Sequence, residues 1–375
     1  MRRPEPRPED RAGQHLMGGF PGTAPPLTLL ERIGAGRLGG VILFKRNIES
    51  AAQLLELTDA LQRAAARSPL GHPLLIAIDE EGGRVSRLSA DFTLLPPARN
   101  LGRIGDPGLA RAAARAVGEE LRAVGVNLDF APVLDLLTNP ACAVIGDRSF
   151  GEDPAAASAL GAAFAAGLQE AGVGACAKHF PGIGSMAPDP HETLPSSDLS
   201  LDGLRRRELV PFRGALAPGP PGGGVAAVMA AHALFTRIDP ERPASLSPRF
   251  LRDLLRGELG FGGLAVTDDL EMGAIADAAQ AAWDSLRAGA DLALVCHTEE
   301  LQERAWRRIL EGLKAEEIPP DEQFRSLRRI SEIKVRYAAP PLSHQLEQGD
   351  LARRHRERER IVGCAAHRAI RQKVI

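Results

Sequence analysis

Short apolar runs alternate with longer amphipathic stretches along most of this chain, and this alternation limits its fold more than any other feature. Each apolar run has the length of a buried strand, and each stretch between two runs has a helical period. Strands that alternate with helices form a parallel sheet with helices on its faces. The predicted strands cover residues 39–44, 74–78, 126–130, 173–177, 225–231, 264–267 and 292–296. The predicted helices cover residues 51–66, 109–124, 155–171, 201–216, 248–259, 275–289, 299–315 and 321–337.

The number and the endings of these strands favour a closed barrel over an open sheet. At least seven strands are predicted, and nearly all end in polar residues, as is typical of a (β/α) barrel. Residues 14–22 are predicted to be a turn, because they lack the spacing of a nucleotide-binding loop and no strand precedes them. The first unit has no Gly-rich phosphate loop, which argues against a Rossmann fold. We therefore expect an α/β fold, a single (β/α)8 barrel of the TIM type, regular or irregular, with C-terminal helices.

The length of 375 residues fits either one large barrel or two modest domains. A Pro/Gly stretch at residues 217–224 is short enough to be a loop rather than a domain boundary. We expect the barrel to occupy residues 1–340 and a basic C-terminal tail or helix to occupy residues 341–375. The basic residues and scattered apolar positions of this tail indicate a packed or partly disordered terminal helix, with a membrane-binding helix as the alternative.

Charge and cysteine content argue against several classes of function. The formal net charge of −2 offers no attraction for nucleic acid or an anionic membrane. The N-terminus has no apolar signal segment, and no apolar run approaches the length of a membrane span. The four cysteines lack metal-ligand spacing, and buried free thiols indicate a reducing, cytoplasmic compartment. These are Cys142, Cys176, Cys296 and Cys364. We expect no metal, no nucleic-acid partner and no membrane span, while the oligomeric state is not determined by the sequence.

One stretch carries most of the candidate chemistry. Residues 178–184 read Lys-His-Phe-Pro-Gly-Ile-Gly and follow the predicted strand at residues 173–177. A second carboxylate–imidazole pair, Asp189 and His191, lies on the loop beyond. Ligands gather at the C-terminal ends of strands in parallel α/β folds, so a site is expected here. The alternative is a surface loop that happens to carry two histidines.

Polar residues at other strand ends fit a sugar site. Asp79 ends a predicted strand, and Arg87 follows eight residues later. Such an acceptor–donor pair clamps the hydroxyl groups of a sugar or fixes a carboxylate, although a structural ion pair is the alternative. Gly82 and Gly83 between them indicate a backbone that passes close to another group. Arg148 lies in a second turn and is equally compatible with a site or with the scaffold.

Asp268 is a candidate nucleophile. It directly follows the predicted strand at residues 264–267, whereas Asp269 must leave the strand in the opposite direction and would cap the next helix. A carboxylate nucleophile with a proton-transferring group on another loop is the arrangement of a retaining glycosidase. His191 would transfer the proton, with Asp189 fixing its tautomer. A zinc site formed by His179, His191 and His232 is the competing hypothesis, which no ligand spacing supports.

Five ordered motifs resemble glycoside hydrolase family 3, in particular its single-domain β-N-acetylhexosaminidases of peptidoglycan recycling. The motifs lie at residues 78–85, 146–151, 178–184, 189–191 and 267–272. The resemblance implies that Asp268 is the nucleophile and that His191 is the acid/base with Asp189 as its partner. It also implies a cofactor-free retaining β-N-acetylglucosaminidase acting on muropeptides, small carbohydrate substrates. The residues implied to hold the N-acetylglucosamine ring are Asp79, Arg87, Arg148, Lys178 and His179.

Two positions depart from the family's pattern. The family usually has His where Ile183 stands, and Ser where Pro190 stands between Asp189 and His191. Pro190 fixes its own φ and favours an extended Asp189, which either misaligns the pair or orders the loop in advance. Two alternatives therefore stay open beside the glycosidase: a catalytically impaired sugar-binding barrel, and a glycoside phosphorylase, since a histidine tolerates an incoming phosphate better than a glutamate would.

Overall fold

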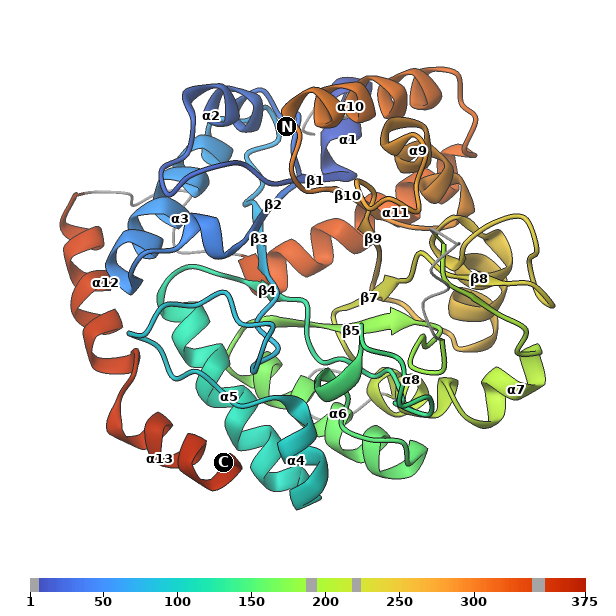
Figure 1. Ribbon diagram of the computed structural model, residues 1–375. Coiled ribbons are helices and arrows are strands. Elements are labelled where there is room, and N and C mark those ends of the chain that lie inside the picture. The colour runs from blue at the N-terminus through green and yellow to red at the C-terminus, as the bar shows by residue number, and fades with distance from the viewer. Residues whose placement is uncertain (1–6, 187–193, 218–223, 339–347) are drawn as a thin grey trace.

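The protein is described from a computed structural model that covers residues 7–186, 194–217, 224–338 and 348–375. Within these residues, eight parallel strands form a closed barrel in the order β1-β10-β9-β7-β5-β4-β3-β2. Helices surround the barrel (Figure 1). The strands are β1 Leu16–Gly18, β2 Gly40–Leu43, β3 Leu75–Ile78, β4 Leu128–Asp129, β5 Gly174–Phe180, β7 Ala227–Ala230, β9 Leu264–Asp269 and β10 Leu292–Val295. The predicted (β/α)8 barrel of the TIM type is confirmed.

The strand that closes the barrel was missed in the sequence. Residues 14–22 were expected to form a turn, but β1 lies within them and pairs with β10 on one side and β2 on the other. Leu16 is opposite Ala293, and Met17 is opposite Gly40. A strand of three residues is too short to show a period of its own, so only its neighbours on both sides define it.

The helices mostly follow the prediction, and their starts have local causes. Asp106, Asp153 and Asp277 cap α5, α6 and α9 through side-chain bonds to backbone N–H groups. The predicted helix at residues 201–216 is divided into two shorter helices. The α-helices are α1 Pro8–Gln14, α2 Leu27–Gly34, α3 Ala51–Ala66, α4 Ala98–Ile104, α5 Pro107–Ala123, α6 Pro154–Glu170, α7 Leu201–Arg206, α8 Leu209–Leu216, α9 Ala278–Ala288, α10 Glu299–Lys314, α11 Pro320–Ile333, α12 Gln348–Ile361 and α13 Ala365–Val374.

Shorter elements complete the chain. Short 3-10 turns, η1 Lys45–Asn47, η2 Gly146–Arg148 and η3 Ala244–Leu246, lie in the loops, and η4 Arg249–Glu258 and η5 Lys334–Ala338 are π-helical. Two strands outside the barrel, β6 Ser196–Ser197 and β8 Leu234–Phe235, pair with each other.

The interior of the barrel is packed with side chains rather than open. Met17, Phe130 and Met229 are buried in one apolar cluster inside it. Ile333 and Tyr337, from α11 and η5, belong to the same cluster and close the N-terminal end of the barrel. A second and larger cluster lies between the strands and the surrounding helices. Functional groups are therefore left to the C-terminal ends of the strands.

The C-terminal helices pack on the outside of the barrel. In Figure 1, α13 lies beside α4 and α5, and α12 lies near α3. Arg354 of α12 pairs with Asp59 of α3 at 3.1 Å. Among the described helices, none combines the length and the apolar character needed to cross a membrane. The division of the chain at residue 340 stays a prediction.

Candidate active site

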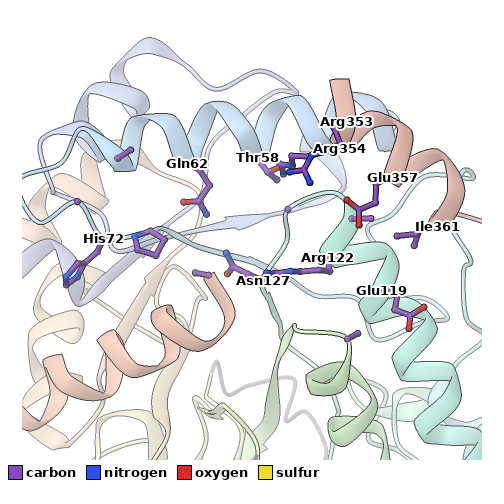
Figure 2. A pocket seen from close by; sticks show the side chains of 17 residues that line it. Thr58, Gln62, His72, Glu119, Arg122, Asn127, Arg353, Arg354, Glu357 and Ile361 are labelled. Carbon is purple, nitrogen blue, oxygen red and sulfur yellow. The ribbon is translucent and has the colours of Figure 1, made fainter. Parts of the chain in front are cut away.

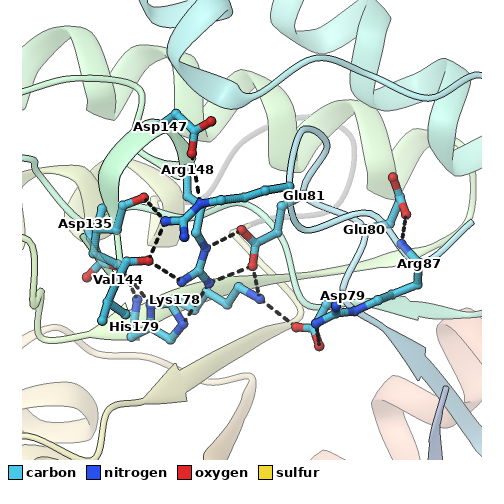
Figure 3. A network of polar contacts seen from close by, with 12 residues as sticks. Asp79, Glu80, Glu81, Arg87, Asp135, Val144, Asp147, Arg148, Lys178 and His179 are labelled. Atoms are coloured by element: carbon cyan, nitrogen blue, oxygen red, sulfur yellow. Dashed lines mark hydrogen bonds and ion pairs between the residues drawn. The ribbon is translucent and has the colours of Figure 1, made fainter. Parts of the chain in front are cut away.

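A buried lysine organises the polar cluster at the C-terminal ends of the strands. Lys178, near the end of β5, is only 1% exposed, and its Nζ lies 2.7 Å from Asp79 Oδ1 and 2.5 Å from Glu81 Oε1. Burial alone would lower the pKa of Lys178, but the carboxylates of Asp79 and Glu81 outweigh burial and raise it. Lys178 is therefore a fixed cation that joins β5 to the loop after β3, as Figure 3 shows.

Arg148 extends this cluster through Glu81. Its Nε donates to Glu81 Oε2 at 2.7 Å and its Nη2 donates to Glu81 Oε1 at 2.8 Å, a bidentate pair. Burial acts to raise the pKa of Glu81, but Lys178 and Arg148 lower it to about 2. The sequence placed Glu81 in a motif without giving it a role. Its neighbour Glu80 has the same side chain, so only the turn decides which carboxylate faces the cluster.

Asp79 and Arg87 face each other as predicted, with Asp79 Oδ2 3.6 Å from Arg87 Nη2. Both side chains are partly exposed, at 15% and 28%, so they are accessible to a ligand. The glycines between them adopt positive φ, and a Cβ atom on Gly82 would lie 2.7 Å from the carbonyl oxygen of Pro96. The predicted close approach of the backbone is confirmed.

His179 is held in place by Asp135, a residue to which the sequence had assigned no role. Asp135 Oδ2 lies 2.7 Å from His179 Nδ1 and also accepts from the His179 backbone N–H at 3.1 Å. Its other oxygen accepts from the backbone N–H of Ile183 at 2.8 Å. The imidazole Nε2 lies 3.4 Å from Arg148 Nη2 (Figure 3). Asp135 thus orients the imidazole and fixes the start of the loop that follows. The one signal in the sequence was its place just beyond the predicted strand at residues 126–130.

Asp268 is a partly buried and ionised carboxylate at the end of β9. Burial acts to raise its pKa, but Coulomb interactions, first of all with His179 and His232, outweigh burial and lower the pKa. Asp268 Oδ1 accepts from the backbone N–H of Asp269 at 2.8 Å. Within the described part of the chain, no cation lies at ion-pair distance from Asp268. A carboxylate that is charged and not neutralised by direct pairing is suited to nucleophilic attack.

Asp269 points toward β10, as strand alternation predicted. Its Oδ1 accepts from the backbone N–H of Cys296 at 3.2 Å, and its Oδ2 lies 3.1 Å from His297 Nε2. The expectation that Asp269 caps the next helix is wrong, because Asp277 caps α9. Asp277 lies eight positions after Asp269.

Asp189, Pro190 and His191 lie outside the described residues. The two ends of their loop are described. Asp135 holds one end at Ile183, and on the other the Pro195 carbonyl oxygen accepts from the Leu234 backbone N–H at 2.9 Å. Ile183 follows β5, which carries Lys178, and Leu234 follows β7.

The zinc hypothesis finds no support in the ring contacts. His179 Nδ1 is bonded to Asp135, and His232 Nδ1 lies 2.7 Å from Ser245 Oγ. His232 Nε2 lies 3.0 Å from the Asp269 carbonyl oxygen, so both of its nitrogens have partners. Among the described residues, no three His, Cys, Asp or Glu side chains gather in an arrangement that could hold a metal ion.

A large cavity lies away from this cluster. It has a volume of about 550 Å³ and is bordered by α3, α5 and α12 (Figure 2). Its lining includes His72 before β3 and Asn127 before β4, which places it at the N-terminal ends of the strands. Sites in TIM barrels lie at the opposite end, so we assign the candidate active site to the cluster around Lys178 and Asp268.

Comparison with known proteins places this geometry in a family. Residues 20–333 match the glycosyl hydrolase family 3 N terminal domain. The chain belongs to glycoside hydrolase family 3. It is 42% identical to a β-hexosaminidase of Thiobacillus denitrificans over 291 residues, which cover 74% of this chain and 77% of the relative.

Solved structures of family 3 enzymes are similar to this protein in their fold. A family 3 β-N-acetylglucosaminidase from Paenibacillus sp. str. FPU-7 superposes with a TM-score of 0.87 and 38% identity, over 98% of this chain and 68% of that one. NagZ from Neisseria gonorrhoeae, in complex with N-trifluoroacetyl-D-glucosamine, superposes with a TM-score of 0.70 and 32% identity, over 85% of this chain and 98% of that one. The predicted enzyme class, a glycoside hydrolase of the β-N-acetylhexosaminidase type, is confirmed, whereas the roles of individual residues stay predictions.

Proposed function

We propose that the protein is a retaining, cofactor-free β-N-acetylglucosaminidase of the cytoplasm that removes non-reducing terminal N-acetylglucosamine from muropeptides derived from peptidoglycan. The observation that carries this proposal is the ionised Asp268 at the same end of the barrel as the charged cluster around Lys178. The muropeptide substrate is proposed from the motif resemblance, and the structure in complex with N-trifluoroacetyl-D-glucosamine is in keeping with the sugar.

The sugar ring would be held by five side chains of the cluster. Asp79 has both oxygens engaged with cations, but each ionised oxygen can accept a further hydrogen bond from a sugar hydroxyl. Arg87 and Lys178 beside it can donate to hydroxyl oxygens. Arg148 and His179 would border the same ring from the opposite side, with Asp135 and Glu81 keeping them in position. Ionised partners make such contacts stronger than those between neutral groups.

The reaction would proceed in two displacements at the anomeric carbon. In the first, an Asp268 oxygen forms a bond to this carbon while the bond to the leaving oxygen breaks and that oxygen takes a proton from His191. In the second, His191 takes a proton from water, the water oxygen bonds to the anomeric carbon, and Asp268 leaves. Two inversions give net retention. Asp189 would hold the tautomer of His191 and stabilise its cationic form.

The first experiment compares the hydrolysis of an aryl β-N-acetylglucosaminide with that of an aryl β-glucoside. We expect preference for the N-acetyl sugar, the same products with and without added phosphate, and a β-configured product. A sugar 1-phosphate would identify a phosphorylase instead, and binding without turnover would identify an impaired sugar-binding barrel. A fluorosugar that traps the glycosyl-enzyme should label Asp268, and an adduct on Asp269 would contradict the assignment.

The second experiment tests the natural substrate. We expect a higher kcat/KM for an N-acetylglucosaminyl muropeptide than for a chito-oligosaccharide with the same terminal sugar. Equal kcat/KM values would mean that the enzyme does not recognise the group beyond the scissile bond, and they would contradict the muropeptide assignment.

A further inference from the structure

We infer that the C-terminal helix α13 positions the β3–α4 loop, residues 79–97, which carries Asp79, Glu81 and Arg87. The inference rests on the proposed function in one respect, that this loop binds the sugar. The family match ends at residue 333, so α12 and α13 lie outside it. Contacts of α13, and of Gly363 just before it, with the loop assign a purpose to this part of the chain.

The first link is Glu120 of α5, a carboxylate with no exposed surface. Its oxygens accept from the loop, at 2.8 Å from the Thr93 backbone N–H and at 2.6 Å from the Thr93 hydroxyl. The same carboxylate binds the C-terminal segment, at 3.0 Å from the Gly363 backbone N–H and 2.8 Å from His367 Nδ1. One buried group therefore joins the loop, α5 and the start of α13. A buried carboxylate requires such partners, so losing one is unfavourable.

The second link joins α13 to the loop directly. Arg371 Nε donates to the Leu94 carbonyl oxygen at 2.7 Å. Gly363, which precedes α13, adopts a φ of +61° and packs so closely on the loop that a Cβ atom would lie 2.3 Å from the Asp91 carbonyl oxygen. Asn100 of α4 donates to the Val374 carbonyl oxygen at 3.1 Å. The C-terminal segment thus contacts the loop at Asp91 and Leu94, and it contacts α4 at Asn100.

A hydrogen bond carries this support to the sugar-binding residues. The residue after Leu94 is Leu95, whose carbonyl oxygen accepts from the Gly83 backbone N–H at 2.8 Å. Gly83 follows Glu81 by two residues in the turn that orients Glu81 toward Lys178. One side of the loop is therefore attached to α13, and the other side presents the charged groups. These contacts act on the backbone of the loop. Their loss should therefore shift the positions of Asp79 and Glu81 but should not remove a group that binds the sugar.

The test compares Arg371→Ala with Lys373→Ala in the full chain. Both variants remove one positive charge from α13, but Lys373 is exposed and lies on another face of the helix. Arg371→Lys is the conservative variant, since an ammonium can still donate to the Leu94 carbonyl oxygen. The readouts are KM and kcat for an aryl β-N-acetylglucosaminide, Kd for N-acetylglucosamine, and amide hydrogen exchange of residues 79–97.

We expect Arg371→Ala to raise KM and Kd by about twofold to tenfold, the effect of one lost hydrogen bond, with little change in kcat. Exchange at Gly83 and its neighbours should accelerate, and Arg371→Lys should restore part of both effects. Lys373→Ala should behave as the wild type. If Arg371→Ala does not fold, His367→Gln is measured in its place, since it weakens the link through Glu120 with the same expected result.

Equal KM, Kd and exchange in the Arg371→Ala and Lys373→Ala variants would overturn the inference. So would a fall in stability with no change in exchange at residues 79–97. The exchange measurement needs no substrate, so the inference is tested even if the wild-type protein neither binds N-acetylglucosamine nor hydrolyses its aryl glycoside. That last outcome would reject the proposed function alone.

Discussion

Two buried lysines stand at opposite ends of the barrel and differ in every other respect. Lys178 is 1% exposed at the C-terminal end and lies between the carboxylates of Asp79 and Glu81. Lys334 is 2% exposed at the N-terminal end, where its Nζ donates to the amide oxygen of Gln14 at 2.7 Å. Within the described residues, no carboxylate forms an ion pair with Lys334.

The two surroundings shift the lysine pKa values in opposite directions. At Lys178 two carboxylates outweigh burial and the pKa rises, whereas at Lys334 burial alone acts and lowers the pKa to about 7. Of the two lysines, the one at the end where a sugar would bind therefore keeps its full charge. The other end tolerates a lysine that is only partly protonated at neutral pH, because its role there is to fill and close the barrel.

The largest effect is expected from the nucleophile at the charged end. Asp268→Asn should lower kcat by roughly 10⁴-fold or more, because a neutral amide cannot form the glycosyl-enzyme. Asp269→Asn is the matched control and should keep most of the activity, since Asp269 binds backbone N–H groups and His297 instead. Steady-state kinetics and thermal unfolding of both variants give the result. If the two lose activity equally, Asp268 has no special role.

Lys178→Met tests the charged end as a structural unit. It leaves Asp79 and Glu81 without their shared cation, and breaking a buried ion pair in this way costs about 3–5 kcal/mol of the free energy of unfolding. Affinity for N-acetylglucosamine should fall by roughly tenfold to a hundredfold. Denaturant unfolding and calorimetric titration measure the two effects. Unchanged affinity would place the sugar elsewhere.

Lys334→Met tests the opposite end and should stabilise the protein without changing kcat/KM. The pKa of Lys334 is about 7 in the folded chain and 10.5 ordinarily, so the folded state resists protonation of this lysine. Wild-type stability should rise with pH from about 7 to 10.5, by about 1.4 kcal/mol for each unit at most. The advantage of Lys334→Met should therefore be greatest below pH 7 and vanish near pH 10.5. Thermal unfolding of both proteins across this pH range tests the prediction. If the stability advantage of Lys334→Met does not depend on pH, Lys334 does not change its protonation in this range.

Glu80→Gln is expected to change the stability of the protein less than Lys334→Met does. Its advantage over the wild type should grow with rising pH, whereas that of Lys334→Met shrinks. Burial raises the pKa of Glu80 to about 7 from 4.5, while its Oε2 accepts from Ser86 Oγ and the Arg87 backbone N–H. The folded state thus favours the protonated acid, and wild-type stability should fall as pH rises from about 4.5 to 7. Glu80→Gln, which keeps one acceptor oxygen, should be more stable than the wild type above pH 7 and equal to it below pH 4.5. A stability difference between Glu80→Gln and the wild type that stays constant over this pH range would contradict the raised pKa of Glu80.

Much of the barrel and part of the site could be read from the sequence. Apolar runs and helical periods are local properties, and they located seven of the eight barrel strands among the described residues. Alternation along β9 separated Asp268 from Asp269, and the two glycines after Asp79 indicated the close approach of the backbone that the structure shows. Each of these conclusions depends on residues a few positions apart.

Only the tertiary structure decided the features that depend on distant partners. β1 exists because β10 and β2 pair with its two sides, and Asp135 has a function because it lies against His179. Lys178 and Lys334 are the same residue type in the sequence, yet their pKa values move apart. Desolvation and Coulomb interactions depend on what surrounds a group in space, and folding brings two carboxylates to one lysine and an amide to the other.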